Sequence, residues 1–325
     1  MRRLRRLSSV VVPGAMLVLV VIWRIFDPLA LMERERLRVF DIYQRLAPRE
    51  HVPLPVRIVD IDDESLARHG QWPWHRTVLA DMVRHINNAG ALAIAFDVVF
   101  PEPDRTSPAQ VLKLWPGGET LRSLVGHLPD HDKVFSDALA QAPTVTGFVL
   151  TAEPNDAVPA RKGNFAHAGM NPAPFVPNFA GAVRSLPELD QAAPGNGGLN
   201  LVSERDGIVR RVPMVLRLGD RLYPSLVTET LRVAQGASTS IIRSSGAQGA
   251  MSFGAETGID SIKIGDFVVP TDARGQFWVH YAHASRHHTI SAWRVLVEGV
   301  PLDGLDGALV LIGTSAAGQI GRAHV

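Results

Sequence analysis

Three carboxylates stand at the ends of two apolar segments that have the composition of buried strands. Asp60 and Asp62 end the segment that begins at Val56, and Asp97 directly follows the segment Ala91–Phe96. In an open parallel sheet, neighbouring strand ends meet at one crevice, so these three side chains could bind a cation or a polar ligand there. The pattern therefore makes Asp60, Asp62 and Asp97 candidate site residues.

Two other interpretations of these acids compete with ligand binding. An Asp-x-Asp after a hydrophobic strand resembles the start of phosphohydrolases of the haloacid dehalogenase type, but Glu64 stands where those enzymes have Thr or Val. A membrane-anchored, metal-dependent hydrolase would need all three carboxylates to converge. The structural alternative is that the acids cap the helix that follows, because carboxylates stabilise helix N-termini.

A pair of tryptophans around Pro73 forms the most distinctive segment of the chain. Trp72 and Trp74 precede Arg76 and a predicted helix. Rigid aromatic rings beside a guanidinium could stack on a ligand or bind a partner protein, or could clamp the loop onto the core. We therefore add Trp72, Trp74 and Arg76 to the candidate ligand-binding residues.

A turn at Asp206-Gly207 precedes two adjacent arginines, Arg210 and Arg211, on a predicted strand. Because successive side chains face opposite sides of a strand, only one of the two can point into the fold. An ion pair between a strand arginine and a buried aspartate is the conservative interpretation, and an anion site is the alternative. Asp206 and Arg210 complete the set of candidates.

Other sites of recognisable chemistry are missing from the sequence. There is no P-loop, no G-x-S-x-G elbow, and no kinase or zincin motif, so we expect no cofactor and no catalytic residue. A zinc site would need convergent ligands, and we interpret the histidines of one polar loop as surface residues: His283, His287 and His288.

Composition narrows the class of protein further. The 325 residues carry a formal net charge of +1, which offers no overall field to attract nucleic acid. The absence of cysteine excludes disulfides and thiolate metal sites, so packing must stabilise the fold. Apolar residues make up 46% of the chain, enough for a sizeable core.

The N-terminus has the pattern of a membrane anchor. Four arginines within residues 1–9 precede the apolar run Val10–Trp23, and such positive flanks stay in the cytoplasm. A cleaved signal peptide is the competing interpretation, but the flank after Trp23 has no small-x-small site. We predict a transmembrane helix over residues 10–27 and a membrane-proximal amphipathic helix over residues 28–50.

The elements after residue 50 predict an α/β domain. The strand Val56–Ile61, the helix Thr77–Asn88 and the strand Ala91–Phe96 form a βαβ unit, which a helix at Asp132–Gln141 and a strand at Val145–Leu150 repeat. We expect one domain over residues 51–319 with three layers and a central, mostly parallel mixed sheet.

Two segments rich in small and polar residues lack clear periodicity, and we expect them to be irregular: residues 151–194 and 236–258. Between and after them the sequence predicts further short strands and two helices, one of which begins after Ser225 as its N-cap. The last predicted strand is Ala308–Ile312.

Five stretches in a fixed order resemble the type-two CHASE domain, the cyclase and histidine kinase-associated sensory extracellular domain. They are VRIVDIDDESLARHGQWPWHR, ALAIAFDVVFPEPDRTSP, RDGIVRRVPMVLRLGDRLYPSL, ISAWRVL and GALVLIGTSAAG, and they extend from Val56 to Gly318. The family's recurrent motifs match all of the candidate residues named above except Trp74. They also match Ser65, Pro73, Gly207 and Pro213.

The resemblance implies a sensor outside the bacterial cytoplasmic membrane that binds an unidentified small-molecule or envelope ligand. Such domains are followed by a nucleotide cyclase or a kinase, which this chain lacks, so we expect no enzyme activity here and a homodimer in the full receptor. An envelope protein-interaction module is a further alternative. The final residues 320–325 depart from the family pattern and match the translation of a common sequencing adapter, so we expect a non-native tail.

Overall fold

A computed structural model describes residues 14, 16–17, 31–49, 52, 54–114, 127–247, 258–281 and 288–316. The predicted anchor, apart from Gly14, Met16 and Leu17, and the predicted tail lie outside these residues, as do His283 and His287. No helix of the described ranges has both the length and the apolar character needed to cross a bilayer.

The chain divides into two compact units, a small one of residues 1–52 with 280–284 and a large one of residues 53–279 with 285–325. In the small unit, α2 (Leu31–Leu46) lies within the predicted amphipathic segment. Leu37 is buried there, and the Phe40 ring stands 5.9 Å from the ring of His280.

The large unit is built on a seven-stranded sheet. Its order is β15-β1-β16-β2-β3-β6, and β7 also pairs with β3. Every pairing is parallel except that of β3 with β6. The strands are β1 (Val56–Ile61), β2 (Ala93–Phe96), β3 (Thr144–Thr151), β6 (Gly181–Val183), β7 (Gly195–Gly198), β15 (Thr289–Ser291) and β16 (Leu309–Thr314). The central, mostly parallel sheet is thus confirmed.

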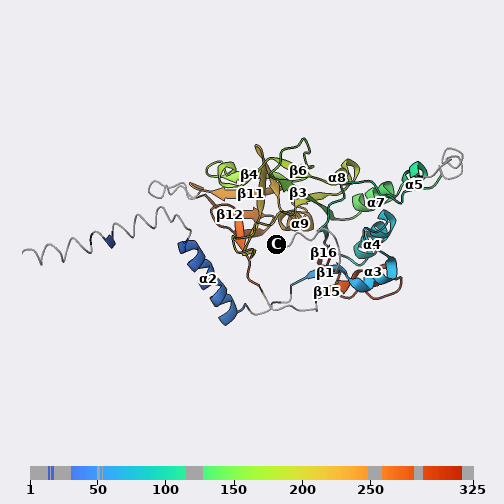
Figure 1. Ribbon diagram of the computed structural model, residues 1–325, viewed down its shortest axis with the longest axis horizontal. Helices are drawn as coiled ribbons and strands as arrows, with labels where there is room; N and C mark the ends of the chain where they lie inside the picture. Colours follow the sequence, from blue (N-terminus) through green and yellow to red (C-terminus); the bar gives the residue numbers. More distant parts are fainter. Residues whose placement is uncertain are drawn as a thin grey trace, which may run out of the picture. The chain divides into compact units, whose positions relative to one another are not determined.

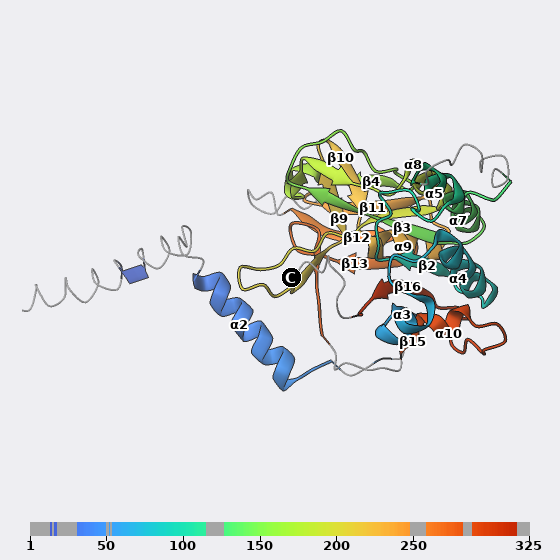
Figure 2. The same ribbon diagram turned by 45° about the vertical axis from the view of Figure 1, so that its right-hand side comes forward.

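One face of this sheet carries a layer of helices over the main hydrophobic core (Figure 1). Ile61, Phe96 and Ile312 point from the strands towards Leu79 of α4 and Phe135 of α7. The helices of this half are α3 (Asp63–His69), α4 (Arg76–Asn88), α5 (Pro108–Leu114), α7 (His131–Ala140), α8 (Pro187–Ala192) and α10 (Ala292–Leu296). Figure 2 shows α3, α10 and β15 gathered at one end of the sheet.

The opposite face packs against α9 (Leu226–Ala234), which gives the third layer of the mixed α/β fold. Ser225 caps this helix and accepts a hydrogen bond from the Thr228 backbone, as the sequence predicts. Because the side chains of a strand alternate, Ala95 and Val145 face Leu226 here while their neighbours face the helical layer.

Smaller sheets extend the unit and overturn part of the irregular assignment. The order β13-β12-β11-β4 joins β4 (Asn164–Ala168) to β11 (Thr239–Ser244), and both strands lie in segments predicted to be irregular. The other members are β5 (Asn178–Phe179), β8 (Arg211–Pro213), β9 (Val215–Leu218), β10 (Arg221–Pro224), β12 (Ile259–Ile264), β13 (Phe267–Pro270) and β14 (Gln276–Trp278), with a 3-10 turn at Ala173–Phe175. Exposed residues interrupt both β4 and β11, so neither is a continuous buried run.

Candidate ligand-binding pocket

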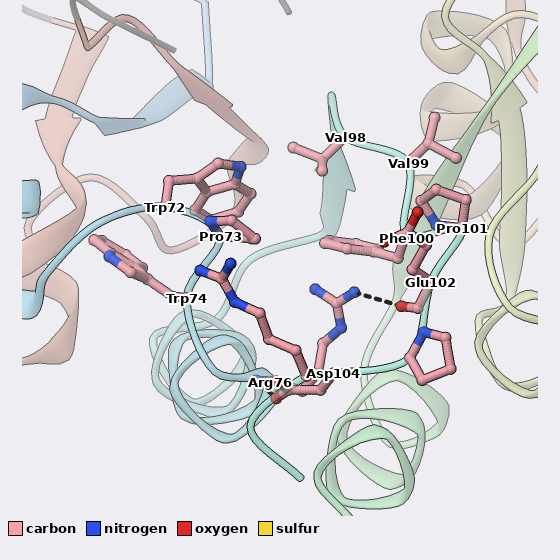
Figure 3. A pocket seen from close by; sticks show the side chains of 12 residues that line it. Trp72, Pro73, Trp74, Arg76, Val98, Val99, Phe100, Pro101, Glu102 and Asp104 are labelled. Atoms are coloured by element: carbon pink, nitrogen blue, oxygen red, sulfur yellow. Dashed lines mark hydrogen bonds between the residues drawn. The ribbon is translucent and has the colours of Figure 1, made fainter. Parts of the chain in front are cut away.

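A pocket of about 390 Å³ opens at the carboxyl end of β2, where ligands bind in open parallel sheets. It is formed by Trp72, Pro73, Trp74 and Arg76 with residues 98–105. Figure 3 shows Trp72 and Pro73 on one wall, across from Val98 and Phe100. The segment that precedes α4 and the segment that follows β2 thus form the pocket.

The two tryptophans have different surroundings. Trp74 is 3% exposed and belongs to the main core, and its indole N–H donates to the Gly70 carbonyl at 2.9 Å. Trp72 is half-buried and meets Trp74 edge to face, with ring centroids 5.9 Å apart. Trp74 therefore fixes the loop, while Trp72 leaves part of its ring towards the pocket.

Arg76 joins the two walls from below. Its guanidinium is buried, bonds to Asp132 at 3.3 Å and to the Glu102 carbonyl at 3.2 Å, and lies 4.5 Å above the centre of the Phe100 ring. Burial lowers the pKa of Arg76, while the charges of Asp132 and Asp104 act in the opposite direction.

Asp104 is held by several donors at the start of α4. The Arg76 backbone N–H donates to its Oδ2 at 2.7 Å, and the N–H and hydroxyl of Thr106 donate to its Oδ1. Burial alone would raise the pKa of Asp104, but these hydrogen bonds and the nearby His131 lower it below the ordinary value. Burial raises the pKa of Asp132, against hydrogen bonding from Asp104 and the charge of Arg76.

The strand-end aspartates have separate hydrogen-bond partners. Asp62 is the N-cap of α3, accepting from the Ser65 N–H at 2.8 Å and from the Ser291 hydroxyl at 2.6 Å, and Asp60 accepts from the Ser315 N–H at 2.9 Å. Burial alone would raise the pKa of Asp62, but its hydrogen bonds lower it.

Strand β16 lies between β1, which ends near Asp60 and Asp62, and β2, which Asp97 follows. Burial raises the pKa of Asp97. The capping interpretation therefore describes Asp62. Within the described residues, the three acids do not form a group with converging donor atoms, which the metal-dependent hydrolase would need.

The last two candidates form an ion pair away from the pocket lining. Arg210 is buried and donates to both Asp206 oxygens, at 3.0 and 2.7 Å, and this hydrogen bonding lowers the pKa of Asp206 to about 2. Arg211 bonds to Glu204 instead and stacks over Trp278. The ion pair predicted as the conservative interpretation is therefore present, but the aspartate is half-exposed and not buried, and Arg210 directly precedes β8 (Arg211–Pro213).

A comparison with models of protein families matches residues 15–322 to the CHASE2 domain. The chain belongs to the CHASE2 family. No curated protein and no solved structure matched the chain. CHASE2 domains are extracellular sensory domains of signalling receptors and are not catalytic, so this chain contains a sensory module.

Sequence reasoning singled out residues from one of the two segments that line the pocket of this CHASE2 domain and missed the other segment, residues 98–105. Trp72, Trp74 and Arg76 were singled out by residue type, whereas Asp104 and Phe100 were not. The stretch FPEPD was a signal that could have found them, because closely spaced prolines after a strand predict a rigid, exposed turn at the sheet's carboxyl end.

Proposed function

We propose that this chain is the extracytoplasmic ligand-sensing part of a bacterial transmembrane receptor whose output is a cytoplasmic nucleotide cyclase or kinase. The family match over residues 15–322 carries the proposal, and the pocket at the carboxyl end of β2 supports it. A ligand that bound one conformation of this pocket better than another would shift the population and bias the output.

The pocket lining favours a small organic ligand that combines a flat or apolar part with negative charge. Trp72 and Phe100 offer aromatic surface, and prolines stiffen both walls. Arg105 brings a second guanidinium into the lining, and guanidinium groups bind carboxylates and phosphates in two-pronged geometry.

Ligand binding can be tested on the full chain by thermal-shift screening of small carboxylates and phosphates. A compound that raises the melting temperature should bind several-fold more weakly to Trp72→Ala and to Arg105→Glu, because both side chains line the pocket. Arg221→Glu makes the same charge change at an exposed position of β10 and should leave binding unchanged. Unaltered affinity in both pocket variants would place the ligand elsewhere.

The proposed topology places residues 1–9 in the cytoplasm, a single anchor over residues 10–27 in the inner membrane, and the sensor in the periplasm. Four N-terminal arginines support this orientation. An alkaline phosphatase fused after Arg49 should be active, because that enzyme works only after export. A fusion active only with a cytosolic reporter would contradict the proposed localisation. In the full receptor we expect a homodimer.

A further inference from the structure

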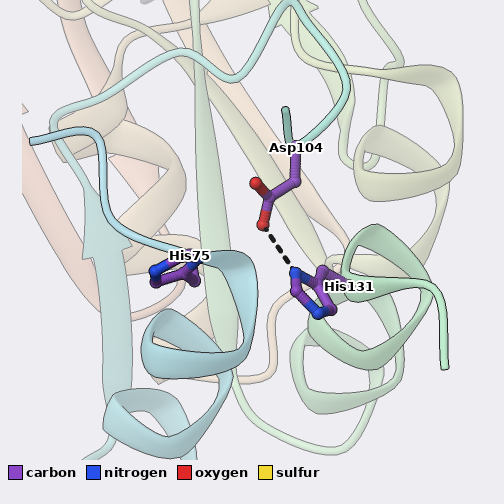
Figure 4. Close-up of side chains that lie close together, drawn as sticks. All are labelled: His75, Asp104 and His131. Atoms are coloured by element: carbon purple, nitrogen blue, oxygen red, sulfur yellow. Dashed lines mark hydrogen bonds and ion pairs between the residues drawn. The ribbon is translucent and has the colours of Figure 1, made fainter. Parts of the chain in front are cut away.

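We propose that His75, Asp104 and His131 form a binding site for a divalent transition metal ion, for which Zn²⁺ is the expected occupant. The three residues each offer one ligand atom, and these atoms all lie within 4.8 Å of one another. Figure 4 shows the two imidazoles on either side of the Asp104 carboxylate. The inference does not depend on the proposed sensory function.

The spacing of His131 and Asp104 is that of two ligands in a tetrahedral zinc site. Zinc bonds of 2.0–2.2 Å to nitrogen and oxygen put neighbouring ligand atoms roughly 3.3 Å apart. Nδ1 of His131 is 3.2 Å from Asp104 Oδ2, and the two imidazole rings stand edge to face with centroids 6.2 Å apart. A small approach of His75 would complete three protein ligands and leave a fourth position for water or for a ligand.

Asp104 is oriented in the way that metal-binding carboxylates are. Its Oδ1 takes both hydrogen bonds from Thr106, while Oδ2 accepts from the Arg76 N–H and faces His131. Partners of this kind fix the direction of a ligating group and strengthen metal binding. The Thr106 hydroxyl also lies 2.6 Å from His75 Nδ1 and 3.2 Å from His131 Nδ1.

The ligand types select the metal. Two imidazoles with one carboxylate suit zinc and its neighbours in the first transition row, whereas Mg²⁺ and Ca²⁺ prefer sets made of oxygen atoms. His75 is exposed and His131 half-buried, so the ion could reach the site from solvent. The formal net charge of the set is −1 with neutral imidazoles, which a divalent cation would reverse.

Metal binding here would connect three segments that are distant in the chain. His75 precedes α4, Asp104 belongs to the loop after β2, and His131 begins α7. Asp104 also lines the pocket, so an ion at this site would fix one of its walls. The ion would act through Asp104 both if it stabilises the fold and if it is itself the sensed signal.

The test is titration of the full, untagged chain with ZnCl₂ after a chelator has removed bound metal. Binding is measured by isothermal calorimetry or by competition with a chromophoric chelator. We expect one ion per chain at this site, and affinity that falls at least about 100-fold in His75→Ala and in His131→Ala, since each variant removes a ligand. Asp104→Asn keeps the side-chain shape and should weaken binding in the same direction. MgCl₂ should not compete.

Two controls separate this site from other histidines. His167→Ala removes an exposed imidazole of β4 and should leave the titration unchanged, as should the double variant His283→Ala/His287→Ala. Circular dichroism establishes that each variant is folded. Because His75 is exposed, we expect His75→Ala to fold like the parent chain. Binding that persists in folded His75→Ala and His131→Ala, or no binding of Zn²⁺ by the parent chain, would overturn the proposal.

Discussion

Arg76 connects the wall of the pocket to the core beneath it. Its pair with Asp132 leaves the two side chains only 8% and 5% exposed, and Asp132 also accepts from the Asp104 N–H at 2.8 Å. A buried ion pair stabilises little compared with an apolar pair, but removing one partner strands the other charge. Arg76 therefore both lines the pocket and stabilises the fold.

Replacing Arg76 with Met should destabilise the chain by about 3–5 kcal/mol, because Asp132 would remain buried without its cation. Urea unfolding measures this loss. The double variant Arg76→Met/Asp132→Asn should lose less than the sum of the two single changes, since it removes the stranded charge. Arg84→Met, also in α4 but in an exposed pair with Asp81, should cost less than about 1 kcal/mol. Equal losses at positions 76 and 84 would contradict this account.

Asp190 in α8 is a buried acid whose pKa is strongly raised. It is fully buried and 3.9 Å from Arg184, and burial raises its pKa to about 6 despite the charges of Arg184 and Lys162. A folded-state pKa above the unfolded value means that the native state holds the extra proton. The free energy of unfolding must then fall as the pH rises from about 4 through 6.

Asp190→Asn should remove this pH dependence, because the amide stays neutral. The shift from 3.8 to about 6 corresponds to roughly 3 kcal/mol, so the variant should gain stability relative to the parent between pH 4 and pH 7.5 by up to that amount. Urea unfolding at the two pH values gives the difference directly. A parent chain whose stability relative to the variant is the same at both pH values would show that Asp190 does not titrate in this range.

At the scale of elements, α9 approaches the sheet closely through the glycines of β7. A Cβ atom on Gly197 would stand 2.6 Å from Leu226 Cα and 2.9 Å from the Ser225 carbonyl oxygen, and backbone atoms cannot move aside as a flexible side chain can. The third layer of the fold therefore requires a residue without a side chain at this position.

Gly197→Ala should destabilise the chain by about 1–3 kcal/mol or more, since it forces α9 away from β7. Gly313→Ala in β16 is the matched control, because its nearest neighbour would be Asp97 Cβ at 3.8 Å, an ordinary contact. Thermal unfolding of both variants compares the two positions. Similar melting temperatures for the two variants would show that α9 can shift without cost.

Elements with strong periodicity could be predicted from the sequence, and elements with weak alternation could not. The apolar run Val56–Ile61 predicts β1 with its exact bounds, and the helical spacing after Thr77 predicts α4 to within one residue. β4 has mostly exposed side chains, so no buried run marks it. Its pairing with β11, which is distant in sequence, is what makes it a strand.

At the scale of the whole molecule, the order of strands in the sheet was beyond sequence reasoning. The pattern shows that β1 and β2 belong to a parallel sheet but not that β16 lies between them. The same limit explains the missed site residues, because His75, Asp104 and His131 converge only after α4 and α7 pack on the sheet. Residue types such as Trp72 and Arg76 can be singled out without knowing any long-range contact.

The position of β16 makes the fold depend on residues near the end of the chain. β16 pairs with β1 through six residues and with β2 through four. It therefore joins β1 to β2 within the seven-stranded sheet. Val310 and Ile312 of this strand are fully buried in the main core. Without β16, both neighbours expose unpaired backbone groups and the core loses its centre.

A fragment of residues 1–308 should therefore fail to fold cooperatively, whereas the full chain should show a single steep urea transition for the large unit. Hydrogen exchange should find the amides of β1 and β2 unprotected in the fragment. Adding a peptide of residues 305–316 should restore part of that protection, because the peptide supplies the missing strand to both partners. A fragment with a cooperative transition and protected β1 amides would show that β1 and β2 can pair directly, and that the strand order of the large unit is not fixed by β16.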